Sequence, residues 1–373
     1  MIPYGHQSIE QDDIDAVVRV LKSDWLTTGP AVDEFEKKLC SYTKGKYAVA
    51  VNSGTSALDV AVQALQIPQG SEVISTPFTF AATNNALLYN GLKPVFADIR
   101  KDTHNIDPDC IRKKITPKTK AIIFVDFAGH PCDIDQIQEI AQEHDLCLID
   151  DACHALGASY HGKKAGTFAD VNVFSFHPVK AITTGEGGAI LTDNPDLAER
   201  MHLLRSHGKK DFKEQENEEQ AWKYDMVLLG KNYRMNDIQA ALGISQLAKL
   251  DRFIKRRNEL ASRYNKLLKE ISFIDLPEIK EGVIHAWHLY TILLNSVDRD
   301  TFFRFMRRNG IGVNVHYIPT YRLTYYQKLL HTNPKKFPVC EDVFHRIITL
   351  PLYPGMNEDS LEYVTERIRT FKL

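Results

Sequence analysis

The chain has 373 residues, of which 43% are apolar and 25% charged, and its formal net charge at pH 7 is −2. This length and composition predict a globular protein with a large domain and a smaller one, and exclude any electrostatic reason to expect nucleic acid or an anionic membrane as a partner. No apolar stretch is long enough to span a bilayer and the amino terminus shows no signal-peptide pattern, so we expect a cytoplasmic protein.

The predicted elements begin with a helix and continue with seven short apolar runs. The helix extends from Ser8 to about Ser23, with Ser8 and Gln11 as a capping box. Its apolar stripe is formed by Ile14, Val17, Val18 and Leu21. The apolar runs, separated by helical patterns, are Tyr47–Val51, Glu72–Thr76, Pro94–Ala97, Ala121–Val125, Cys147–Ile149, Asn172–Phe174 and Ala189–Thr192. Because most of them are continuously apolar, we expect an α/β fold with a mostly parallel seven-stranded central sheet and helices on both faces.

The character of the chain changes after Leu247. A long charged helix from Asp251 to about Ile271 leads to a half-buried strand at Trp287–Leu294 and to two further segments, Phe302–Arg308 and Val313–Tyr317. This pattern predicts a smaller carboxyl-terminal α+β domain, residues 248–373, after an amino-terminal arm and large domain, residues 1–247. The polar segment Lys209–Lys223 is expected to be a surface loop or, alternatively, a lid.

Cysteine and histidine spacing gives no indication of a metal site. The six cysteines form no Cys-x-x-Cys pair and the fourteen histidines show no His-Glu-x-x-His spacing. We expect reduced thiols and no bound metal.

The first candidate site segment is Ser53-Gly-Thr-Ser56, which lies between an apolar strand and a helical pattern. A turn of this kind presents free backbone N–H groups and hydroxyls at a helix start, where a phosphate is stabilised. Ser and Thr are also ordinary helix caps, so the segment alone is not decisive.

The second segment, Asp150-Asp-Ala-Cys-His154, follows the apolar run Leu146–Ile149. It predicts a buried strand with acids at its carboxyl end, where open α/β sheets bind ligands. A buried carboxylate needs a positive partner, and a protonated pyridinium nitrogen provides one. Alternatively, one of the two acids caps the following helix or supports the turn, a role we expect for Asp150.

The third segment places Lys180 at the end of Phe174-Ser-Phe-His-Pro-Val-Lys180, just before the glycine-rich Thr183-Thr-Gly-Glu-Gly-Gly188. Apolar surroundings penalise the ammonium form and favour an amine that attacks a carbonyl. A surface lysine is the ordinary alternative. A phosphate cradle, a carboxylate at a strand end and this lysine, in that order, make a specific combination.

With these residues the chain resembles the DegT/DnrJ/EryC1/StrS sugar aminotransferases, which are fold-type I pyridoxal-phosphate enzymes. The resemblance extends from Tyr4 to about Tyr353. Besides the three segments it includes Trp25-Leu-Thr-Thr-Gly29, Thr76-Pro-Phe-Thr-Phe80, Arg205-Ser-His-Gly208, Gly230-Lys-Asn-Tyr-Arg-Met235 and Leu350-Pro-Leu352.

The resemblance implies pyridoxal 5′-phosphate held as an internal aldimine on Lys180, which then acts as a general base. It places Asp151 opposite the pyridine nitrogen, His154 near the 3-oxygen and Phe80 against the ring. Asn232 is expected to reach the phosphate from the neighbouring subunit, which implies a homodimer with shared sites; Arg234 is either a second contact or only an interface ion pair. The other implied cofactor contacts are Ser53, Gly54, Thr55, Ser56 and Ser175.

Within the family, the chain is most similar to the branch that makes the 4-amino precursor of pseudaminic acid. This implies transfer of an amino group from L-glutamate to C4 of UDP-2-acetamido-2,6-dideoxy-β-L-arabino-hex-4-ulose, although no arginine is assignable to the donor's α-carboxylate. The implied substrate contacts are Tyr4, Trp25, Leu26, Thr27, Ser53, Asn232, Asn314, Val315, His316 and Tyr317.

Three alternatives remain open from the residues. The acceptor is alternatively another keto sugar: the other C5 epimer, a dTDP-linked sugar or UDP-4-keto-arabinose. The dehydratase branch of the fold replaces the lysine with histidine, which Lys180 argues against. A cofactor-free or regulatory relative would require one of the three segments to be broken.

Overall fold

The computed structural model describes residues 1–211 and 222–371. Residues 212–221, in the middle of the predicted polar loop, lie outside the described residues. Described residues on either side of it pair as a short antiparallel ladder, β10 (Lys209–Asp211) with β11 (Tyr224–Met226).

The large sheet has seven strands in the order β1-β9-β8-β5-β4-β2-β3. Every pairing is parallel except those of β9, which runs antiparallel to both β1 and β8. The strands are β1 (Tyr47–Val51), β2 (Glu72–Ser75), β3 (Lys93–Phe96), β4 (Thr119–Val125), β5 (Cys147–Asp151), β8 (Val171–Ser175) and β9 (Gly188–Thr192). The predicted α/β class and mostly parallel seven-stranded sheet are therefore confirmed.

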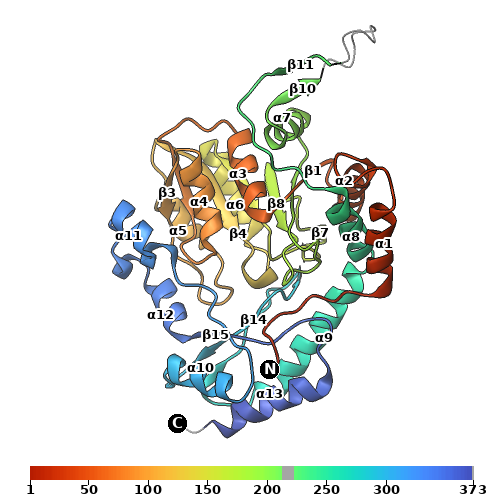
Figure 1. Ribbon diagram of the computed structural model, residues 1–373. Coiled ribbons are helices and arrows are strands. Elements are labelled where there is room, and N and C mark those ends of the chain that lie inside the picture. Colours follow the sequence, from red (N-terminus) through yellow and green to blue (C-terminus); the bar gives the residue numbers. More distant parts are fainter. Residues whose placement is uncertain (212–221, 372–373) are drawn as a thin grey trace.

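Helices cover both faces of this sheet, because alternate strand residues point to opposite sides and nearly all of them are apolar. Figure 1 shows the layers. The helices packed in one core are α2 (Pro30–Thr43), α6 (Ile134–His144) and α8 (Asp237–Leu247). The helices packed in the other are α3 (Gly54–Ala64), α4 (Ala81–Tyr89) and α7 (Pro195–Arg205).

A third core lies under the large sheet in Figure 1. It surrounds a three-stranded sheet of order β12-β14-β15. Its elements are α9 (Leu250–Leu268), β12 (Ile274–Asp275), β14 (Tyr290–Leu294), α10 (Arg299–Arg308), β15 (Ile347–Leu350) and α13 (Glu358–Thr370). The division of the chain at residue 248 stays a prediction.

The remaining elements are short. A small sheet joins β13 to β6 and β7. The bounds are α5 (Pro108–Arg112), β6 (Ser159–Tyr160), β7 (Lys163–Lys164), β13 (Val283–Ile284), α11 (Thr324–Leu330) and α12 (Pro338–Arg346). Among the described residues, no helix has the length and apolar character needed to cross a membrane.

Two predictions about the first helix were wrong. Helix α1 (Gln11–Leu21) begins later than expected, and its capping box is formed by Glu10 and Asp13, not by Ser8 and Gln11. Its buried side chains are Asp13 and Ala16, so three members of the predicted stripe (Ile14, Val18 and Leu21) are exposed to solvent.

One prediction in the carboxyl-terminal part, the half-buried strand at Trp287–Leu294, also needs correction. Strand β14 begins only at Tyr290 and is buried on both faces. Helix α12 packs against it, in addition to the helices α9, α10 and α13 that share its core. Residues 313–317 are extended without forming a strand, with one isolated bridge between Asn314 and Thr349. The long charged helix is confirmed as α9.

Candidate active site

A cavity of about 540 Å³ opens where parallel strands of the large sheet end. Strands β1, β2, β5 and β8 deliver their following residues to this edge, and the extended segment 313–317 closes the cavity from the other side. The predicted site residues that line it are Tyr4, Ser53, Gly54, Thr55, Phe80, Asp151, His154, Ser175, Lys180, Asn314, Val315, His316 and Tyr317.

The start of α3 is a backbone cradle on one side of the cavity. Ser53 caps the helix by accepting a hydrogen bond from the Ser56 N–H at 3.0 Å. A Cβ atom on Gly54 would lie only 2.8 Å from the Ser175 Cβ, so glycine is required for the approach of the two segments. The N–H groups of the first turn and the Thr55 and Ser175 hydroxyls border this cradle, an arrangement that favours a phosphate.

Ser56 is not part of the cavity lining. Its hydroxyl is buried and bonds to Asn52 Oδ1 at 2.5 Å and to Ser53 Oγ at 2.7 Å. The structure therefore gives this side chain a role in bracing the turn.

Asp151, the last residue of β5, is a buried carboxylate in the cavity wall. It accepts hydrogen bonds from the Thr83 hydroxyl at 2.6 Å and from the Cys153 N–H at 3.3 Å. Thr83 Oγ1 in turn lies 2.9 Å from the Thr79 hydroxyl. Asp151 has no ion-pair partner in the part of the chain that the structure describes, so a cationic ligand group would complete its environment.

Asp150 does not support the turn as expected. Both of its carboxyl oxygens are buried without a hydrogen-bond partner among the described residues. Burial, reinforced by the nearby Asp126 and Asp151, raises the pKa of Asp150 well above its usual range and so favours its neutral form.

Lys180 follows β8 in a tight turn, in which its N–H bonds to the His177 carbonyl at 2.9 Å. Burial lowers the pKa of the Lys180 amine, although Cys153 and Asp151 favour its charged form. Its Nζ lies 3.5 Å from Nε2 of His288, a buried residue that the sequence did not single out.

His154 is held in one tautomer. Its Nδ1 accepts a hydrogen bond from the Ala128 N–H at 3.3 Å, and its Nε2 lies 3.1 Å from the Tyr317 hydroxyl. Burial, with a contribution from Lys180, lowers the pKa of His154 well below its usual range. A neutral ring whose Nδ1 accepts must carry its proton on Nε2, which therefore donates to Tyr317.

The cavity wall opposite the sheet is formed by segment 313–317. His316 is fixed by the Thr349 hydroxyl at 2.8 Å and the Asn314 amide at 3.2 Å. Its ring centroid lies 5.3 Å from that of Tyr4, which the amino-terminal arm brings here by pairing Ile2 with Ile311. Burial lowers the pKa of His316 to about 3, so this wall presents uncharged polar groups.

Phe80 stands at the opening of the cavity with 61% of its surface exposed. Its ring centroid lies 6.2 Å from that of Tyr317. An exposed aromatic ring beside a cavity is suited to stack on a planar ligand.

The structure does not bring every predicted residue to the cavity of one chain. Trp25, Leu26 and Thr27 are exposed between α1 and α2, and Asn232 is exposed beside Ser206, to which it pairs through a single bridge. Arg234 is half-buried and pairs with Val51. In a single chain, none of the five lines the cavity.

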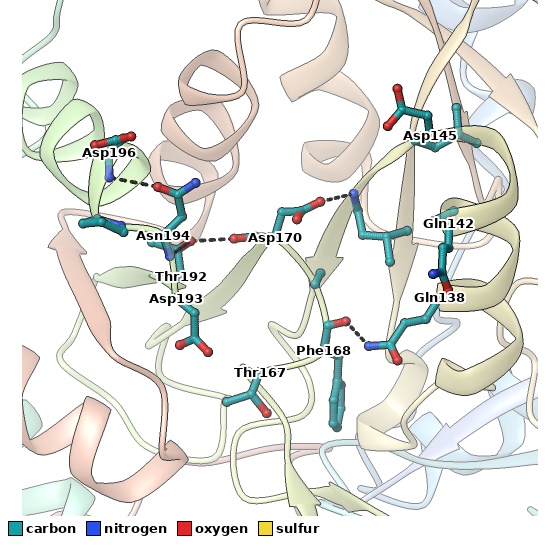
Figure 2. Close-up of a pocket in the computed structure, with 15 residues that line it drawn as sticks. Gln138, Gln142, Asp145, Thr167, Phe168, Asp170, Thr192, Asp193, Asn194 and Asp196 are labelled. Carbon is teal, nitrogen blue, oxygen red and sulfur yellow. Dashed lines mark hydrogen bonds between the residues drawn. The ribbon is translucent and has the colours of Figure 1, made fainter.

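A larger cavity of about 950 Å³ lies at the opposite edge of the same sheet (Figure 2). Its polar groups support the fold: Asp170 accepts from the Leu148 N–H and the Thr192 hydroxyl, and Asn194 caps α7. Among the described residues, no group of histidine, cysteine and acidic side chains is arranged to hold a metal ion. The chemistry is therefore expected at the cavity that contains Lys180 and Asp151.

Comparison with known proteins agrees with this geometry. The model of the DegT/DnrJ/EryC1/StrS aminotransferase family matches residues 7–369. The chain belongs to this family.

Three relatives of this aminotransferase are informative. It is 41% identical to the UDP-4-amino-4,6-dideoxy-N-acetyl-beta-L-altrosamine transaminase of Campylobacter jejuni, over 99% of this chain and 96% of the relative. It matches the structure of Helicobacter pylori PseC, an aminotransferase involved in the biosynthesis of pseudoaminic acid, with a TM-score of 0.93 and 36% identity over 99% and 98% of the two chains. It matches the PLP-form of a putative sugar aminotransferase, Spr1654 of Streptococcus pneumoniae, with a TM-score of 0.93 and 32% identity over 99% and 98%.

The protein is thus a pyridoxal-phosphate-dependent sugar aminotransferase, and the residues present fit that cofactor. The α3 cradle suits its phosphate, Phe80 offers an unpaired ring face, and Asp151 lacks a cation among the described residues. A lysine with a lowered pKa lies on the same cavity. These observations come from four separate segments of the chain.

Sequence analysis missed two residues of the aminotransferase site, Thr83 and His288. Thr83 lies three residues after Phe80, and the helical pattern from Ala81 gave a signal that Thr79 and Thr83 share one face. His288 had no such signal, because its neighbours were interpreted only as the beginning of a strand.

Proposed function

We propose that the aminotransferase moves the amino group of L-glutamate to C4 of UDP-2-acetamido-2,6-dideoxy-β-L-arabino-hex-4-ulose, which gives the UDP-4-amino sugar. The names of the Campylobacter jejuni and Helicobacter pylori relatives support this acceptor. The shape of the site supports it as well, since a wall of uncharged polar groups faces the catalytic lysine across the cavity.

Lys180 is the proposed covalent attachment point of pyridoxal phosphate, which supplies an electron sink when bound. With the cofactor bound, the Lys180 Nζ would be the general base that takes the proton from the donor Cα and later returns it. The lowered pKa of the Lys180 amine favours the uncharged form that both tasks require.

Asp151 and His154 have distinct proposed roles in this reaction. Asp151, oriented by Thr83, accepts a hydrogen bond from a protonated ring nitrogen and keeps that nitrogen charged. His154 is neutral and donates to Tyr317, so it orients a hydroxyl and moves no proton itself.

The sugar is proposed to bind between the arm and segment 313–317. Tyr4, Asn314, His316 and Tyr317 line this part of the cavity and offer hydroxyl, amide and imidazole groups. Such groups pair with the hydroxyl and acetamido groups of a sugar without requiring charge.

We further propose that the active unit is a homodimer with shared sites. Asn232 and the segment Trp25–Thr27 do not line the cavity of their own chain. Apolar side chains are exposed on neighbouring segments, among them Trp25, Leu26 and Leu229. A second copy of the chain would cover these side chains and bring Asn232 to the partner's cavity.

The observation that carries the proposed chemistry is the presence of Lys180 and Asp151 on one cavity beside the α3 cradle. The test is incubation of the purified protein with glutamate and both C5 epimers of the UDP-4-keto sugar, a dTDP-4-keto-6-deoxyhexose and UDP-4-keto-arabinose, with mass spectrometry of the products. We expect an amino sugar only from the β-L-arabino epimer. If only another sugar is aminated, the proposed acceptor is wrong and the proposed aminotransferase reaction still holds.

The role of Lys180 is tested separately. In Lys180→Ala we expect loss of amination by at least about 10³-fold, because both the attachment point and the base are removed. Borohydride reduction followed by peptide mass spectrometry should find the cofactor on Lys180 in the wild type. Cofactor trapped on a different lysine would refute the assignment.

A further inference from the structure

His288 contacts the amine of Lys180, and its role has not yet been explained. It precedes β14 and reaches the large sheet because the Ala286 N–H bonds to the Gly129 carbonyl and the Leu289 N–H bonds to the Ala128 carbonyl. Its Nε2 lies 3.5 Å from Lys180 Nζ, and its ring centroid lies 4.3 Å from that of His154.

The other nitrogen of the ring, Nδ1, is buried and has no hydrogen-bond partner among the described residues. A buried N–H without a partner is rarer in proteins than a buried acceptor without one, because an acceptor keeps a lone pair at lower cost. The tautomer that leaves Nδ1 unprotonated therefore fits this environment better. In that tautomer the proton is on Nε2 and points at the Lys180 amine.

The surroundings of His288 keep its ring neutral. The groups that face it are Lys180 after β8, His154 after β5, Arg257 on α9 and His316 before β15, all of them basic. The two acidic groups nearby, Asp151 and Cys153, favour the charged form of Lys180. Burial and these basic neighbours hold the pKa of His288 well below its usual range, so its Nε2–H is a permanent donor.

We propose that His288 is a positioning residue that donates its Nε2–H to the lone pair of the Lys180 amine and so holds this amine in its uncharged, nucleophilic form. An ammonium group has no lone pair and would face the N–H dipole, so it is disfavoured at this position. The proposal rests on the proposed function in one respect, namely that Lys180 is the lysine that captures the cofactor.

The two tautomers predict opposite results, which makes the proposal testable. If Nε2 donates, removal of the ring nitrogen stabilises the ammonium form and raises the pH at which Lys180 becomes reactive. If Nε2 accepts from the ammonium, the same change lowers that pH. The hydrogen bond is worth about one pH unit in either direction.

The experiment measures the rate at which the full-length chain, freed of cofactor by hydroxylamine treatment and dialysis, captures pyridoxal phosphate across a range of pH. Capture joins the Lys180 nitrogen to the aldehyde carbon with release of water, and a new visible absorption band reports it. In His288→Phe we expect the midpoint of the pH–rate curve to rise by about one unit. In His288→Gln, whose amide keeps an N–H donor, we expect it to stay near the wild-type value.

A matched control is His104→Phe. His104 is also a buried, neutral histidine, packed against Phe78 and Phe127, but it does not line the cavity. We expect its midpoint to be unchanged, which separates the hydrogen bond of His288 from a general effect of losing a buried imidazole.

A second measurement does not depend on the Phe variant folding. In the wild-type chain labelled with ¹⁵N-histidine, nuclear magnetic resonance distinguishes the tautomers, and the signal lost in either His288 variant identifies the residue. We expect the Nε2–H tautomer. An Nδ1–H tautomer, or a midpoint that stays or falls in His288→Phe, would overturn the proposal. Capture that persists in Lys180→Ala would instead refute the role of Lys180.

Discussion

Thr83 is the side chain that sets the direction of the Asp151 carboxylate. Its hydroxyl donates to Asp151 at 2.6 Å from the first turn of α4, and the helix fixes its position. A carboxylate held by a neutral donor keeps its charge available for a ligand, whereas a lysine or arginine in this place would neutralise it. The choice of threonine thus preserves the negative charge of the cavity wall.

The first prediction concerns Thr83→Val, which removes this hydroxyl and keeps the shape of the side chain. We expect pyridoxal phosphate to bind about tenfold more weakly, because Asp151 loses a charge-assisted hydrogen bond that orients it. The measurement is a titration of cofactor followed by protein fluorescence. The control is Thr79→Val, which leaves the bond between Thr83 and Asp151 in place, and equal weakening in the two variants would contradict the explanation.

The second prediction concerns Asp126, which is fully buried behind the cavity beside Asp150. Burial, helped by the charge of Asp151, raises the pKa of Asp126 to about 7. Because an unfolded aspartate has a pKa of about 3.9, the folded chain binds the extra proton between these two values. The stabilising contribution is therefore complete below pH 4 or so and is lost as the pH rises through about 7.

Asp126→Asn removes this titration. Between about pH 4 and about pH 7 we expect the free energy of unfolding of the wild type to fall more steeply than that of the variant, by up to about 1.4 kcal/mol per pH unit. Urea unfolding followed by circular dichroism at several pH values measures both slopes. Parallel curves for the two proteins would show that Asp126 does not titrate in this range.

At the scale of elements, the strands were predictable because each is a short, nearly continuous apolar run buried on both faces. The presence of helix α1 was predictable, but its first residue and the face that it buries were not. The pairs Ser8 with Gln11 and Glu10 with Asp13 have the same spacing, and only tertiary contacts of Asp13 with Ser245 and Gln246 select the second pair. The same contacts turn Asp13 inward and Leu21 outward.

The third prediction follows from this orientation of α1. Ile14, Val18 and Leu21 form an exposed apolar face, and Leu21 has 55% of its surface exposed. If this face packs in the proposed homodimer, Leu21→Glu should weaken dimerisation by at least about tenfold, since a charge would be buried. Sedimentation velocity measures the change. Lys22→Glu introduces the same charge at the next position and serves as the control; a dimer that is equally stable in both variants would place the interface elsewhere.

At the scale of the whole molecule, the site is made from segments far apart in sequence. The cradle, Asp151 and Lys180 could be predicted because each follows a recognisable strand, and parallel strands end at one edge. His288 could not, since nothing local to Ala286–Leu289 indicates that this stretch pairs with Ala128 and Gly129. A Cβ atom at Gly129 would lie 2.8 Å from the His154 carbonyl oxygen and 3.1 Å from the backbone nitrogen of His288, so this contact also depends on glycine.

The fourth prediction tests whether two chains share one site. Lys180→Ala and Asn232→Ala should each be inactive alone, but in a mixed dimer one site would carry both changes and the other neither. In an unfractionated mixture with random assortment we expect about a quarter of the wild-type amination rate, because half of the dimers are mixed and each has one intact site; in the isolated mixed dimer we expect about half. Co-expression with two affinity tags provides the mixed dimer. If mixing restores nothing, Asn232 acts within its own chain or not at all.

The hydrogen bond from His154 to Tyr317 has a consequence for what the cavity can select. Since the Tyr317 oxygen already accepts a hydrogen bond from His154, its own hydroxyl hydrogen is not used in a bond to any other residue that the structure describes. Burial raises the pKa of this phenol, so the hydroxyl keeps its hydrogen at neutral pH. The Tyr317 hydroxyl can thus donate a hydrogen bond to a ligand in the cavity. Ligands that present an electron-rich oxygen at this point are favoured, and ligands that present a second donor there are rejected.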